Sequence, residues 1–424
     1  MKAIIQKPPH GGTIQAISSK SHAHRALIAA ALADTATEVV CSDMNADILA
    51  TVQCLQAMGA QISSQNGAFS VLPLQRPLAA ISRHLDVGES GSTLRFMLPV
   101  ACVLGAHADF TMGGRLPQRP LSPLYEELTA HGCTLSPQGS SPLTVSGQLT
   151  GGTFRIAGNI SSQFITGLLM ALPVLPDDSR IEIIGSLESR PYVDITLQVL
   201  REFGIAIQED ENVFSIPGGQ TYRSPGRITI DGDWSNAACW LALGAIGQTP
   251  VTVTGLNLQS PQGDKAILPL LTRFGATVDC TGDGITVSGG ALRGIAVDAA
   301  ATPDLIPVIA AVAMAAREQT HIYNAARLRL KECDRLSAIA QTLDAFGARI
   351  VETGDSLFFV AGGSLHGGTV SSQNDHRIVM MAALASAVCN DAIIIENADA
   401  VNKSYPRFFE DFRRLGGQIQ EVLP

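Results

Sequence analysis

Charged and aromatic residues are both scarce in this sequence of 424 residues. Charged side chains make up 16% of it and aromatic ones 5%, while hydrophobic residues reach 46%. This composition excludes a mainly disordered chain, because so many apolar residues can build a buried core. There are 29 lysines and arginines against 38 acidic residues, a net charge of -9. A negative balance argues against bulk binding to nucleic acid or to an acidic membrane, although it allows a local cationic pocket.

Paired cysteines and long apolar runs are missing as well. The 8 cysteines are scattered, without a C-x-x-C pair or a metal-like spacing. Such thiols are typical of a reducing compartment rather than of a disulfide framework or a zinc site. The longest uncharged apolar runs, such as 305–316, fall short of the ~20 residues needed to span a bilayer, and the start carries no secretory apolar core. We therefore expect a soluble, cytoplasmic globular protein.

Two signatures recur along the chain with the same period of about 71 residues. The first is a polar or capped start before an uncharged shaft of small apolar residues, near Lys20, Gly91, Ser161, Trp234, Thr302 and Asn374. The second is a helical run that ends in a glycine, at Gly59, Gly132, Gly204, Gly275, Gly347 and Gly416. Glycine at such a position fits a left-handed helix cap that leads into a strand. Because two markers agree on one period, the sequence predicts six repeats.

Each repeat is predicted to hold a buried helix, a short strand, an amphipathic helix and two further short strands. This alternation indicates an α/β architecture with mixed sheets. The length of the chain favours two lobes over a single core. The residues alone leave open whether six units form an open solenoid or close into two groups of three. Closure is favoured, because an open stack would leave one face of each apolar helix in water.

Cations and hydroxyls stand at equivalent points of several repeats, always before a helix. Lys20 and Arg25 open the first shaft, and Gly91 and Arg95 open the second. Helix N-termini favour anions, since unpaired N–H groups and the macrodipole both attract negative charge. Each motif alone is compatible with an ordinary N-cap beside a solvated cation. Their common position in the repeats instead indicates an anion-binding site.

The densest group of ionisable side chains lies at 327–336. An exposed helix with Lys331 and Arg335 four residues apart would be self-repelling, so a plain surface helix is disfavoured. Cations mixed with carboxylates beside an apolar neighbourhood indicate a site with shifted pKa values. By contrast, the acidic helix start at 231–235 has no cation nearby in the sequence, and we interpret it as mainly structural.

Taken jointly, these motifs resemble the 5-enolpyruvylshikimate-3-phosphate synthase family, and the likeness runs from about residue 2 to the C-terminus. The motifs that carry it are Ser19-Lys20-Ser21 with Arg25, Gly91-Ser92-Thr93-Leu94-Arg95, Arg119-Pro120, Ser161-Ser162-Gln163, 191–197, 331–336, Asn374-Asp375-His376-Arg377 and Lys403. The resemblance implies a two-lobed inside-out α/β barrel with three repeat units in each lobe. Residues 1–17 and 228–424 would form the first lobe and 18–227 the second, with the active site in the cleft between them.

The resemblance also implies a reaction of the shikimate pathway, which leads to chorismate and the aromatic amino acids. The enolpyruvyl group of phosphoenolpyruvate passes to the 5-hydroxyl of shikimate 3-phosphate, and phosphate is released. The residues that resemble the phosphoenolpyruvate site are Lys20, Gly91, Arg119, Gln163, Arg335, Arg377 and Lys403. Those that resemble the shikimate 3-phosphate site are Ser21, Arg25, Ser161, Ser162, Gln163, Ser189, Tyr192, Asp304 and Lys331.

Asp304 and Glu332 resemble the carboxylates that transfer protons, with Lys20 as a further candidate acid. A carboxylate flanked by cations tends to have a lowered pKa, so it serves better as a base than as an acid. We therefore expect Asp304 to take the hydroxyl proton, and Glu332 or Lys20 to deliver one to carbon. The resemblance implies no metal or organic cofactor, because side chains and helix ends supply the electrostatics. The expected partners are the two small substrates, with neither nucleic acid nor membrane, and the expected state is a monomer.

The sequence departs from the family pattern at four positions. Ser19 stands where glycine is usual, His24 where Asn or Ser is common, Glu89 where Asn is frequent, and Cys333 where Ser or Thr is found. Gly91 is retained, which leaves room for glyphosate, an inhibitor that mimics phosphoenolpyruvate.

Two alternatives remain. The sister enzyme that transfers enolpyruvate to UDP-N-acetylglucosamine shares the fold and the repeat, but it typically has a reactive cysteine in the loop that corresponds to 113–120. That loop has no cysteine here. A non-enzymatic repeat scaffold would present a polar face without a buried ionisable cluster, contrary to the pattern at 331–335.

Overall fold

The computed structural model describes residues 1–76, 82–282 and 284–423, which form two compact units. Unit 1 comprises Met1–Ile17, Asp231–Gln259 and Gly263–Pro424, and unit 2 comprises Ser18–Ile230 and Ser260–Gln262. Unit 2 thus extends a few residues past the lobe boundary predicted at 227. The reason is that β14 (Arg227–Thr229) pairs in parallel with β3 (Thr37–Val40) of the same unit.

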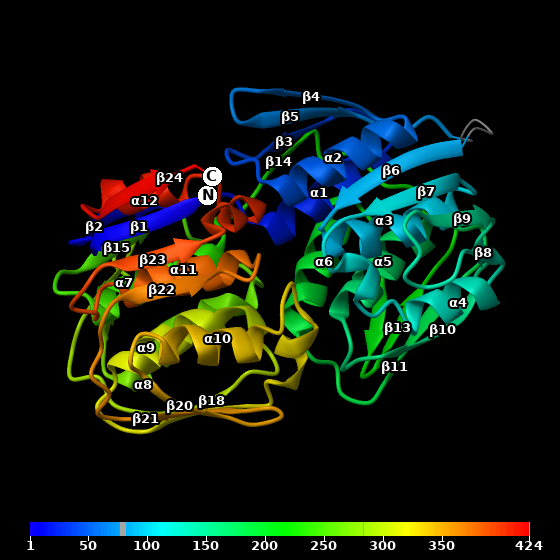
Figure 1. The fold of residues 1–424 in the computed structure, drawn as a ribbon. Coiled ribbons are helices and arrows are strands. Elements are labelled where there is room, and N and C mark those ends of the chain that lie inside the picture. The colour runs from blue at the N-terminus through cyan, green and yellow to red at the C-terminus, as the bar shows by residue number, and fades with distance from the viewer. Residues whose placement is uncertain (77–81, 283, 424) are drawn as a thin grey trace. The chain divides into compact units, whose positions relative to one another are not determined.

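Unit 2 is built on three helices whose side chains are buried on nearly every side: α1 (Lys20–Leu32), α3 (Gly91–Val103) and α5 (Ser162–Ala171). Helix α5 packs against both of the others (Figure 1). A helix that is apolar all round cannot face water, so this composition places all three in the core. The remaining helices of the unit are α2 (Ala46–Met58), η1 (Leu116–Gln118), α4 (Leu124–Ala130), η2 (Leu172–Val174) and α6 (Arg190–Glu202).

The sheets of unit 2 share one topology, in which the first two strands are parallel and the next two are each antiparallel to their neighbour. The first sheet has the order β14, β3, β5 (Ala68–Leu72), β4 (Gln61–Gln65). The second is β6 (Ser82–Gly88), β7 (His107–Met112), β9 (Leu143–Gly147), β8 (Cys133–Leu135). The third is β10 (Gly152–Ala157), β11 (Ser179–Ile184), β13 (Val213–Ile216), β12 (Gln208–Asp210).

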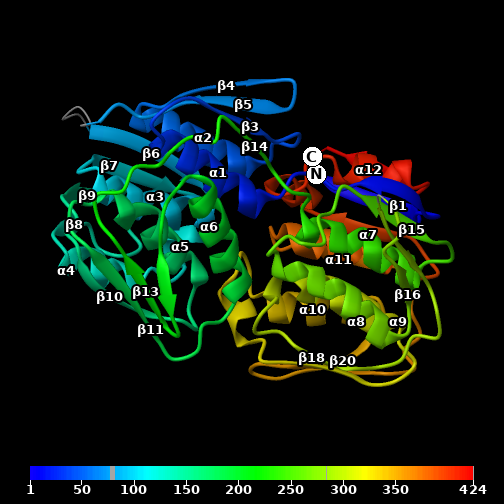
Figure 2. The same cartoon turned by 180° about the vertical axis from the view of Figure 1, so that it is seen from behind.

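Unit 1 follows the same plan. Its buried helices are α7 (Trp234–Ile246), α9 (Ile306–Ala315) and α11 (His376–Ala385), and each of them contacts the other two (Figure 2). The other helices are η3 (Gly263–Ala266), α8 (Ile267–Phe274), η4 (Pro303–Leu305), η5 (Ala326–Leu330), α10 (Arg335–Asp344), η6 (Ala398–Lys403) and α12 (Phe408–Arg414).

The sheets of unit 1 repeat the parallel pair followed by two antiparallel neighbours. The first sheet has the order β2 (Gly12–Gln15), β15 (Val251–Thr254), β17 (Gly284–Ser288), β16 (Thr277–Asp279). The second is β18 (Ala296–Asp298), β19 (Thr320–Tyr323), β21 (Leu357–Val360), β20 (Arg349–Glu352). The third is β22 (Gly368–Ser371), β23 (Ile393–Glu396), β1 (Lys2–Lys7), β24 (Gln418–Val422). Strand β1 lies between β23 and β24, so the two ends of the chain complete one sheet.

The helix starts and glycine caps predicted from the sequence are confirmed. Five of the buried helices begin within two residues of the predicted starts, and at Thr302 the short η4 comes first and leads directly into α9. All six predicted cap glycines have a positive φ, between 73° and 111°. The prediction of three strands in each repeat is wrong, because each sheet has a fourth strand. Strands β6, β10, β18 and β22 are such additional strands. Each of them precedes a buried helix and pairs in parallel with the next strand of the chain.

Within the described ranges, no helix combines the length and the apolar character needed to cross a membrane.

Candidate active site

Three cations converge on Asp304 in unit 1. Asp304 belongs to η4, directly before α9, and its carboxylate accepts Arg335 Nη1 at 3.0 Å and Arg377 Nη2 at 3.1 Å. Lys331 Nζ lies 3.5 Å from the same carboxylate. Arg377 also donates to the backbone carbonyl of Asp304 at 2.9 Å, which ties the start of α11 to η4. The carboxylate is thus held in one orientation by charge-assisted bonds from three segments.

Arg335 is buried to 1% exposure although it is charged. Its guanidinium donates to Glu332 at 2.5 Å and, through Nε, to Asp375 at 2.9 Å, in addition to Asp304. Burial acts to lower the pKa of Arg335, but the adjacent carboxylates, Asp375 first, raise it above its ordinary value. Burial likewise acts to raise the pKa of Asp375, and the charge of Arg335 lowers it overall. Each partner therefore keeps the other ionised inside the fold.

Asp375 also fixes the start of α11. It is fully buried at the N-cap of that helix, and its carboxylate accepts the backbone N–H of Arg377 at 2.8 Å. One carboxylate therefore orients both arginines of the cluster, one through its side chain and the other through its backbone. The start predicted at Asn374-Asp375-His376-Arg377 is confirmed as a capped helix end.

Lys331 lies between two helices and is not part of a charged surface helix, which the charge pattern of this segment disfavours. It follows η5, and α10 begins only at Arg335, with Asp334 as the N-cap that accepts from the backbone N–H of Ser337. Burial lowers the pKa of Lys331 to about 8, while Asp304 acts in the opposite direction. The shifted pKa values expected in this segment are therefore present.

Two further side chains connect the helix starts of unit 1. Ser235, in the first turn of α7, accepts a hydrogen bond from Arg377 Nη2 at 2.7 Å. The capped helix start expected at 231–235 is confirmed, with Asp233 as the N-cap of α7. The cation that contacts Ser235 lies 142 positions away in the chain and was not expected from the sequence. Lys403, at the end of η6, donates to the backbone carbonyl of Asn374 at 2.6 Å.

In unit 2, contacts link the starts of α3 and α5 with the loop that carries Arg119. Arg95 donates to Gln163 Oε1 at 2.7 Å and to the carbonyl of Pro120 at 2.9 Å. Gln163 in turn donates to Ser92 Oγ at 2.9 Å. A Cβ atom added at Gly91 would lie 2.8 Å from Nη1 of both Arg95 and Arg119. A side chain at position 91 would therefore displace the ends of these two guanidinium groups from the helix start.

The first turns of α1 hold the other predicted cations of unit 2. Lys20 Nζ lies 2.8 Å from Asp47, and both side chains are about one sixth exposed. Arg25 is buried, and it donates to Thr196 Oγ1 at 2.8 Å and to the carbonyls of Ser21 at 2.5 Å and Tyr192 at 2.9 Å. Burial lowers the pKa of Arg25 to about 9, so it remains a cation at neutral pH.

Hydroxyl groups complete the predicted set in unit 2. Ser161 is the N-cap of α5 and accepts from the backbone N–H of Gln163 at 3.3 Å, and Ser162 is buried in the first turn. Ser189 is the N-cap of α6 and has a φ of 54°, in the left-handed region. A buried serine in that conformation is rare and is typical of a functional position. Tyr192 lies in the first turn of the same helix.

The four departures from the family pattern have defined surroundings. Ser19 caps α1 by accepting the backbone N–H of His22, and His24 contacts Thr51 Oγ1 at 2.6 Å. Burial, followed by the charges of Lys20 and Arg25, lowers the pKa of His24, which keeps it neutral. Glu89 packs on the Gly113–Gly114 turn, where a Cβ at Gly114 would lie 2.5 Å from its Cδ. Cys333 Sγ lies 3.5 Å from Asp375, and burial raises its pKa, so it stays a thiol.

Several partners of the predicted residues were not found from the sequence. Asp47, Asp375, Ser235 and Thr196 contact predicted cations that are 27, 40, 142 and 171 positions away. No local signal connects residues at such separations; the 142 positions between Ser235 and Arg377 equal two repeat periods, so this pair stands at equivalent points of two repeats. Among the described residues, no group of three or more His, Cys, Asp or Glu side chains has the arrangement of a metal site.

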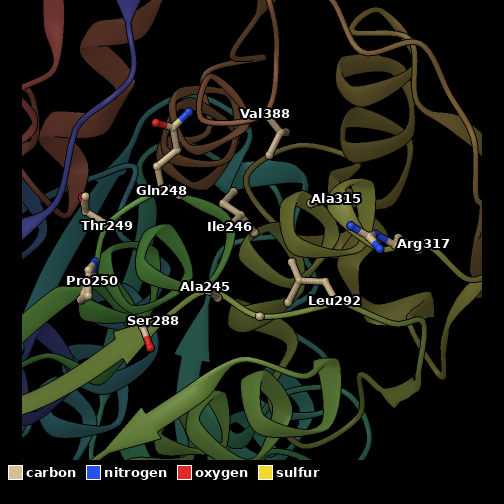
Figure 3. Close-up of a pocket in the computed structure, with 13 residues that line it drawn as sticks. Ala245, Ile246, Gln248, Thr249, Pro250, Ser288, Leu292, Ala315, Arg317 and Val388 are labelled. Carbon is tan, nitrogen blue, oxygen red and sulfur yellow. The ribbon is translucent and has the colours of Figure 1, made fainter.

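Among the hollows lined by the described residues, one in each unit has room for a small ligand. In unit 2, one of about 170 Å³ borders Arg119 and is walled by Leu94 of α3 and by Leu116 and Leu121 of the neighbouring loop. In unit 1, one of about 520 Å³ lies where α7 and α9 end, with Arg317 as the only charged side chain among its lining residues (Figure 3). The second hollow contains none of the predicted site residues.

Comparison with known proteins gives a consistent result. The family described as EPSP synthase (3-phosphoshikimate 1-carboxyvinyltransferase) matches residues 6–412. The chain is 41% identical over 417 residues to the 3-phosphoshikimate 1-carboxyvinyltransferase of Clostridium kluyveri, covering 97% of this chain and 96% of that protein. It is 38% identical over 423 residues to the protein of that name from Clostridium perfringens strain 13, covering 99% of both.

Solved structures show the same fold. An EPSP synthase from Acinetobacter baumannii superposes with a TM-score of 0.82 at 24% identity, covering 99% of this chain and 100% of that one. The enolpyruvyl transferase NikO from Streptomyces tendae gives a TM-score of 0.81 at 19% identity, covering 100% of this chain and 99% of that one. With a family match over most of its length and relatives of about 40% identity, the chain belongs to the EPSP synthase (3-phosphoshikimate 1-carboxyvinyltransferase) family.

Proposed function

We propose that this protein transfers the enolpyruvyl group of phosphoenolpyruvate to the 5-hydroxyl of shikimate 3-phosphate. The hydroxyl oxygen adds to C2 of phosphoenolpyruvate while a proton adds to its methylene carbon, which gives a tetrahedral adduct. Loss of phosphate and of a proton from the new methyl group then leaves the enolpyruvyl ether. The observation that carries the proposal is the cluster around Asp304, in which one carboxylate contacts Lys331, Arg335 and Arg377.

In this mechanism Asp304 is the base for the 5-hydroxyl. Three cations stabilise its ionised form, so it can accept a proton at neutral pH. Glu332 or Lys20 protonates the methylene carbon. Glu332 and Asp304 share the guanidinium of Arg335, at 2.5 and 3.0 Å, so a role for Glu332 places both proton-transfer groups on one cation.

The binding roles follow the same chemistry. Phosphoenolpyruvate is held by Lys20, Gly91, Arg119, Gln163, Arg335, Arg377 and Lys403, and shikimate 3-phosphate by Ser21, Arg25, Ser161, Ser162, Gln163, Ser189, Tyr192, Asp304 and Lys331. Both sets contain residues of unit 1 and of unit 2. Guanidinium groups and helix N-termini match the carboxylate and phosphate groups of these substrates.

We further infer that each unit is an inside-out α/β barrel of three repeats. The support is the common strand order of the sheets and the burial of one helix in each repeat. The protein is proposed to work as a cytoplasmic monomer, which a sedimentation measurement at enzyme-assay concentration tests.

The decisive test is release of inorganic phosphate. We expect phosphate to appear only when phosphoenolpyruvate and shikimate 3-phosphate are both present, in a one-to-one ratio with the enolpyruvyl product measured by mass spectrometry. Each substrate alone and UDP-N-acetylglucosamine in place of shikimate 3-phosphate are the controls. Release with the UDP-sugar and none with shikimate 3-phosphate would contradict the proposal.

Glyphosate is expected to inhibit in competition with phosphoenolpyruvate, because both are small anions that need the space beside Arg119. In Gly91→Ala the added methyl would lie 2.8 Å from two guanidinium nitrogens. We expect the inhibition constant to rise by about tenfold or more, as a misplaced methyl group in a tight site does. The control is Gly354→Ala, whose added Cβ meets nothing within 4 Å. A glyphosate titration without effect on the wild type would contradict this prediction.

Shikimate 3-phosphate affinity is expected to weaken as the pH rises above about 8. The pKa of Lys331 is lowered to about 8, so the ammonium that attracts the phosphate is charged below this pH and neutral above it. The dissociation constant should therefore be flat between pH 6 and 7.5 and then rise by at most about tenfold per pH unit. Calorimetry across this range measures it.

Two variants of Lys331 sharpen this test. Lys331→Arg should move the loss of affinity to higher pH, because an arginine keeps its charge. Lys331→Met should bind weakly at every pH, with no transition near 8. Lys2→Met, which removes an exposed lysine of β1, is the matched control. An unchanged profile in Lys331→Met would show that another group causes the transition.

A further inference from the structure

A buried carboxyl group behind the Asp304 cluster has no role in the proposed chemistry. Asp264 lies on η3 of unit 1 and is 4% exposed. Four groups act on it: Ser235 in the first turn of α7, Asp233 at the N-cap of α7, Asp304 on η4 and Arg377 on α11. Its position therefore brings a second carboxyl group to the point where the starts of α7, η4 and α11 meet.

The polarity of the hydrogen bonds connects Asp264 to Arg377 through one hydroxyl. A guanidinium group can only donate, so Ser235 Oγ is the acceptor of its 2.7 Å bond from Arg377 Nη2. The single proton of Ser235 is then free for its other partner, the Asp264 carboxyl. Nη2 carries two protons, and the second one serves Asp304 Oδ2 at 3.1 Å. Arg377 is thus held between two carboxyl groups, Asp304 directly and Asp264 through Ser235.

We propose that Asp264 is a positioning residue that sets the orientation of Arg377 through Ser235, and thereby the affinity for phosphoenolpyruvate. The proposal rests on the proposed function, in which Arg377 binds that substrate. An ionised Asp264 carries the same sign of charge as phosphoenolpyruvate, so it acts on this substrate through Arg377 rather than by binding it. When Asp264 is ionised it can only accept, so Ser235 must donate to it and present a lone pair to Arg377. When Asp264 is protonated it can itself donate to Ser235, and the orientation of the hydroxyl is no longer determined.

The charge state of Asp264 changes in a useful range of pH. Burial, and then repulsion by Asp304, raise the pKa of Asp264 to about 6, while Arg377 and the Ser235 hydroxyl lower it and Asp233 raises it. The KM for phosphoenolpyruvate is therefore expected to increase as the pH falls below about 6. Asp264→Asn keeps a carbonyl acceptor but does not titrate, so its KM should lack this transition.

A double-mutant cycle tests the connection through the hydroxyl. Ser235→Ala should raise the KM for phosphoenolpyruvate by about tenfold, with little change in the affinity for shikimate 3-phosphate measured by calorimetry. Adding Asp264→Asn to Ser235→Ala should change the KM less than Asp264→Asn does alone, because the path through the hydroxyl is already broken. Asp279→Asn, an exposed Asp on β16, is the matched control. Additive effects in the double variant, or a wild-type pH transition that persists in Asp264→Asn, would overturn the proposal.

A second measurement does not depend on turnover. The folded-state pKa of Asp264 is raised above the ordinary 3.8, so the folded protein binds this proton more tightly than the unfolded chain. Relative to Asp264→Asn, the wild type should lose stability as the pH rises from about 4 to about 6, and no more above that. This difference should grow in the Ser235→Ala background, because the Ser235 hydroxyl lowers the pKa of Asp264 and its loss lets burial raise that pKa further. If the wild type releases no phosphate, the proposed function fails, but the unfolding cycle still decides whether Asp264 acts on Arg377 through Ser235. Equal pH dependence of stability in the two backgrounds would refute the proposal for Asp264.

Discussion

Replacing Asp304 by Asn is expected to lower kcat by about 10²–10⁴-fold, the usual contribution of a positioned general base. The amide keeps the size of the side chain but cannot take the proton of the 5-hydroxyl. It also removes the charge that Lys331, Arg335 and Arg377 share. Steady-state phosphate release measures the loss, and circular dichroism shows whether the fold is kept.

The matched control is Asp344→Asn, an exposed aspartate at the end of α10, which should leave kcat within twofold of the wild type. Glu332→Gln separates the two proton-transfer roles. If Glu332 delivers the proton to carbon, this variant should also be slow, and incorporation of solvent deuterium into the product should fall. Near-normal turnover in Asp304→Asn would show that another group removes the hydroxyl proton.

Replacing Arg335 by Met should destabilise the protein by about 3–5 kcal/mol, because it leaves buried carboxylates without their cation. Asp375 is 0% exposed and Arg335 is 1% exposed, so water cannot replace the lost contacts. The matched control is Arg227→Met. Its guanidinium pairs with Glu38 on the surface, with side chains 65% and 46% exposed, and its loss should cost about 0–1 kcal/mol. Urea unfolding at pH 7 measures both.

The effect of Arg335→Met should depend on pH. The pKa of Asp375 in the folded protein lies below its ordinary value of 3.8, so the pair contributes stability above pH 3.8 that is lost as the pH falls through the lower folded value. The difference between wild type and variant should therefore shrink on acidification. In the double variant with Asp375→Asn, part of the loss should be recovered, because the buried charge is gone. An Arg335→Met protein as stable as Arg227→Met would show that the buried ion pairs are not needed for folding.

Local chemistry made much of the fold predictable. A helix cap depends on a side chain and a backbone N–H two or three residues apart, so the starts at Lys20, Gly91 and Ser162 could be found from the residues alone. A glycine with positive φ also leaves a local signal, as at Gly59 and Gly275. The strands before the buried helices left no such signal. Segments such as β18 and β22 are short and partly polar, and only their parallel partners make them strands.

The candidate site likewise has one part that could be predicted from the sequence and one part that could not. The sequence by itself determined which cations and hydroxyls stand at helix starts, because that placement follows from caps and periodicity. Only the tertiary structure decided their partners, because Arg335 and Asp375, or Ser235 and Arg377, are far apart in the chain and meet only where separate helices converge. In a buried setting an unpaired charge is costly, so the burial of each cation and its partners together determine its pKa, and the partners determine its orientation. Sequence reasoning therefore proposed the members of the candidate site, and packing determined their partners and their geometry.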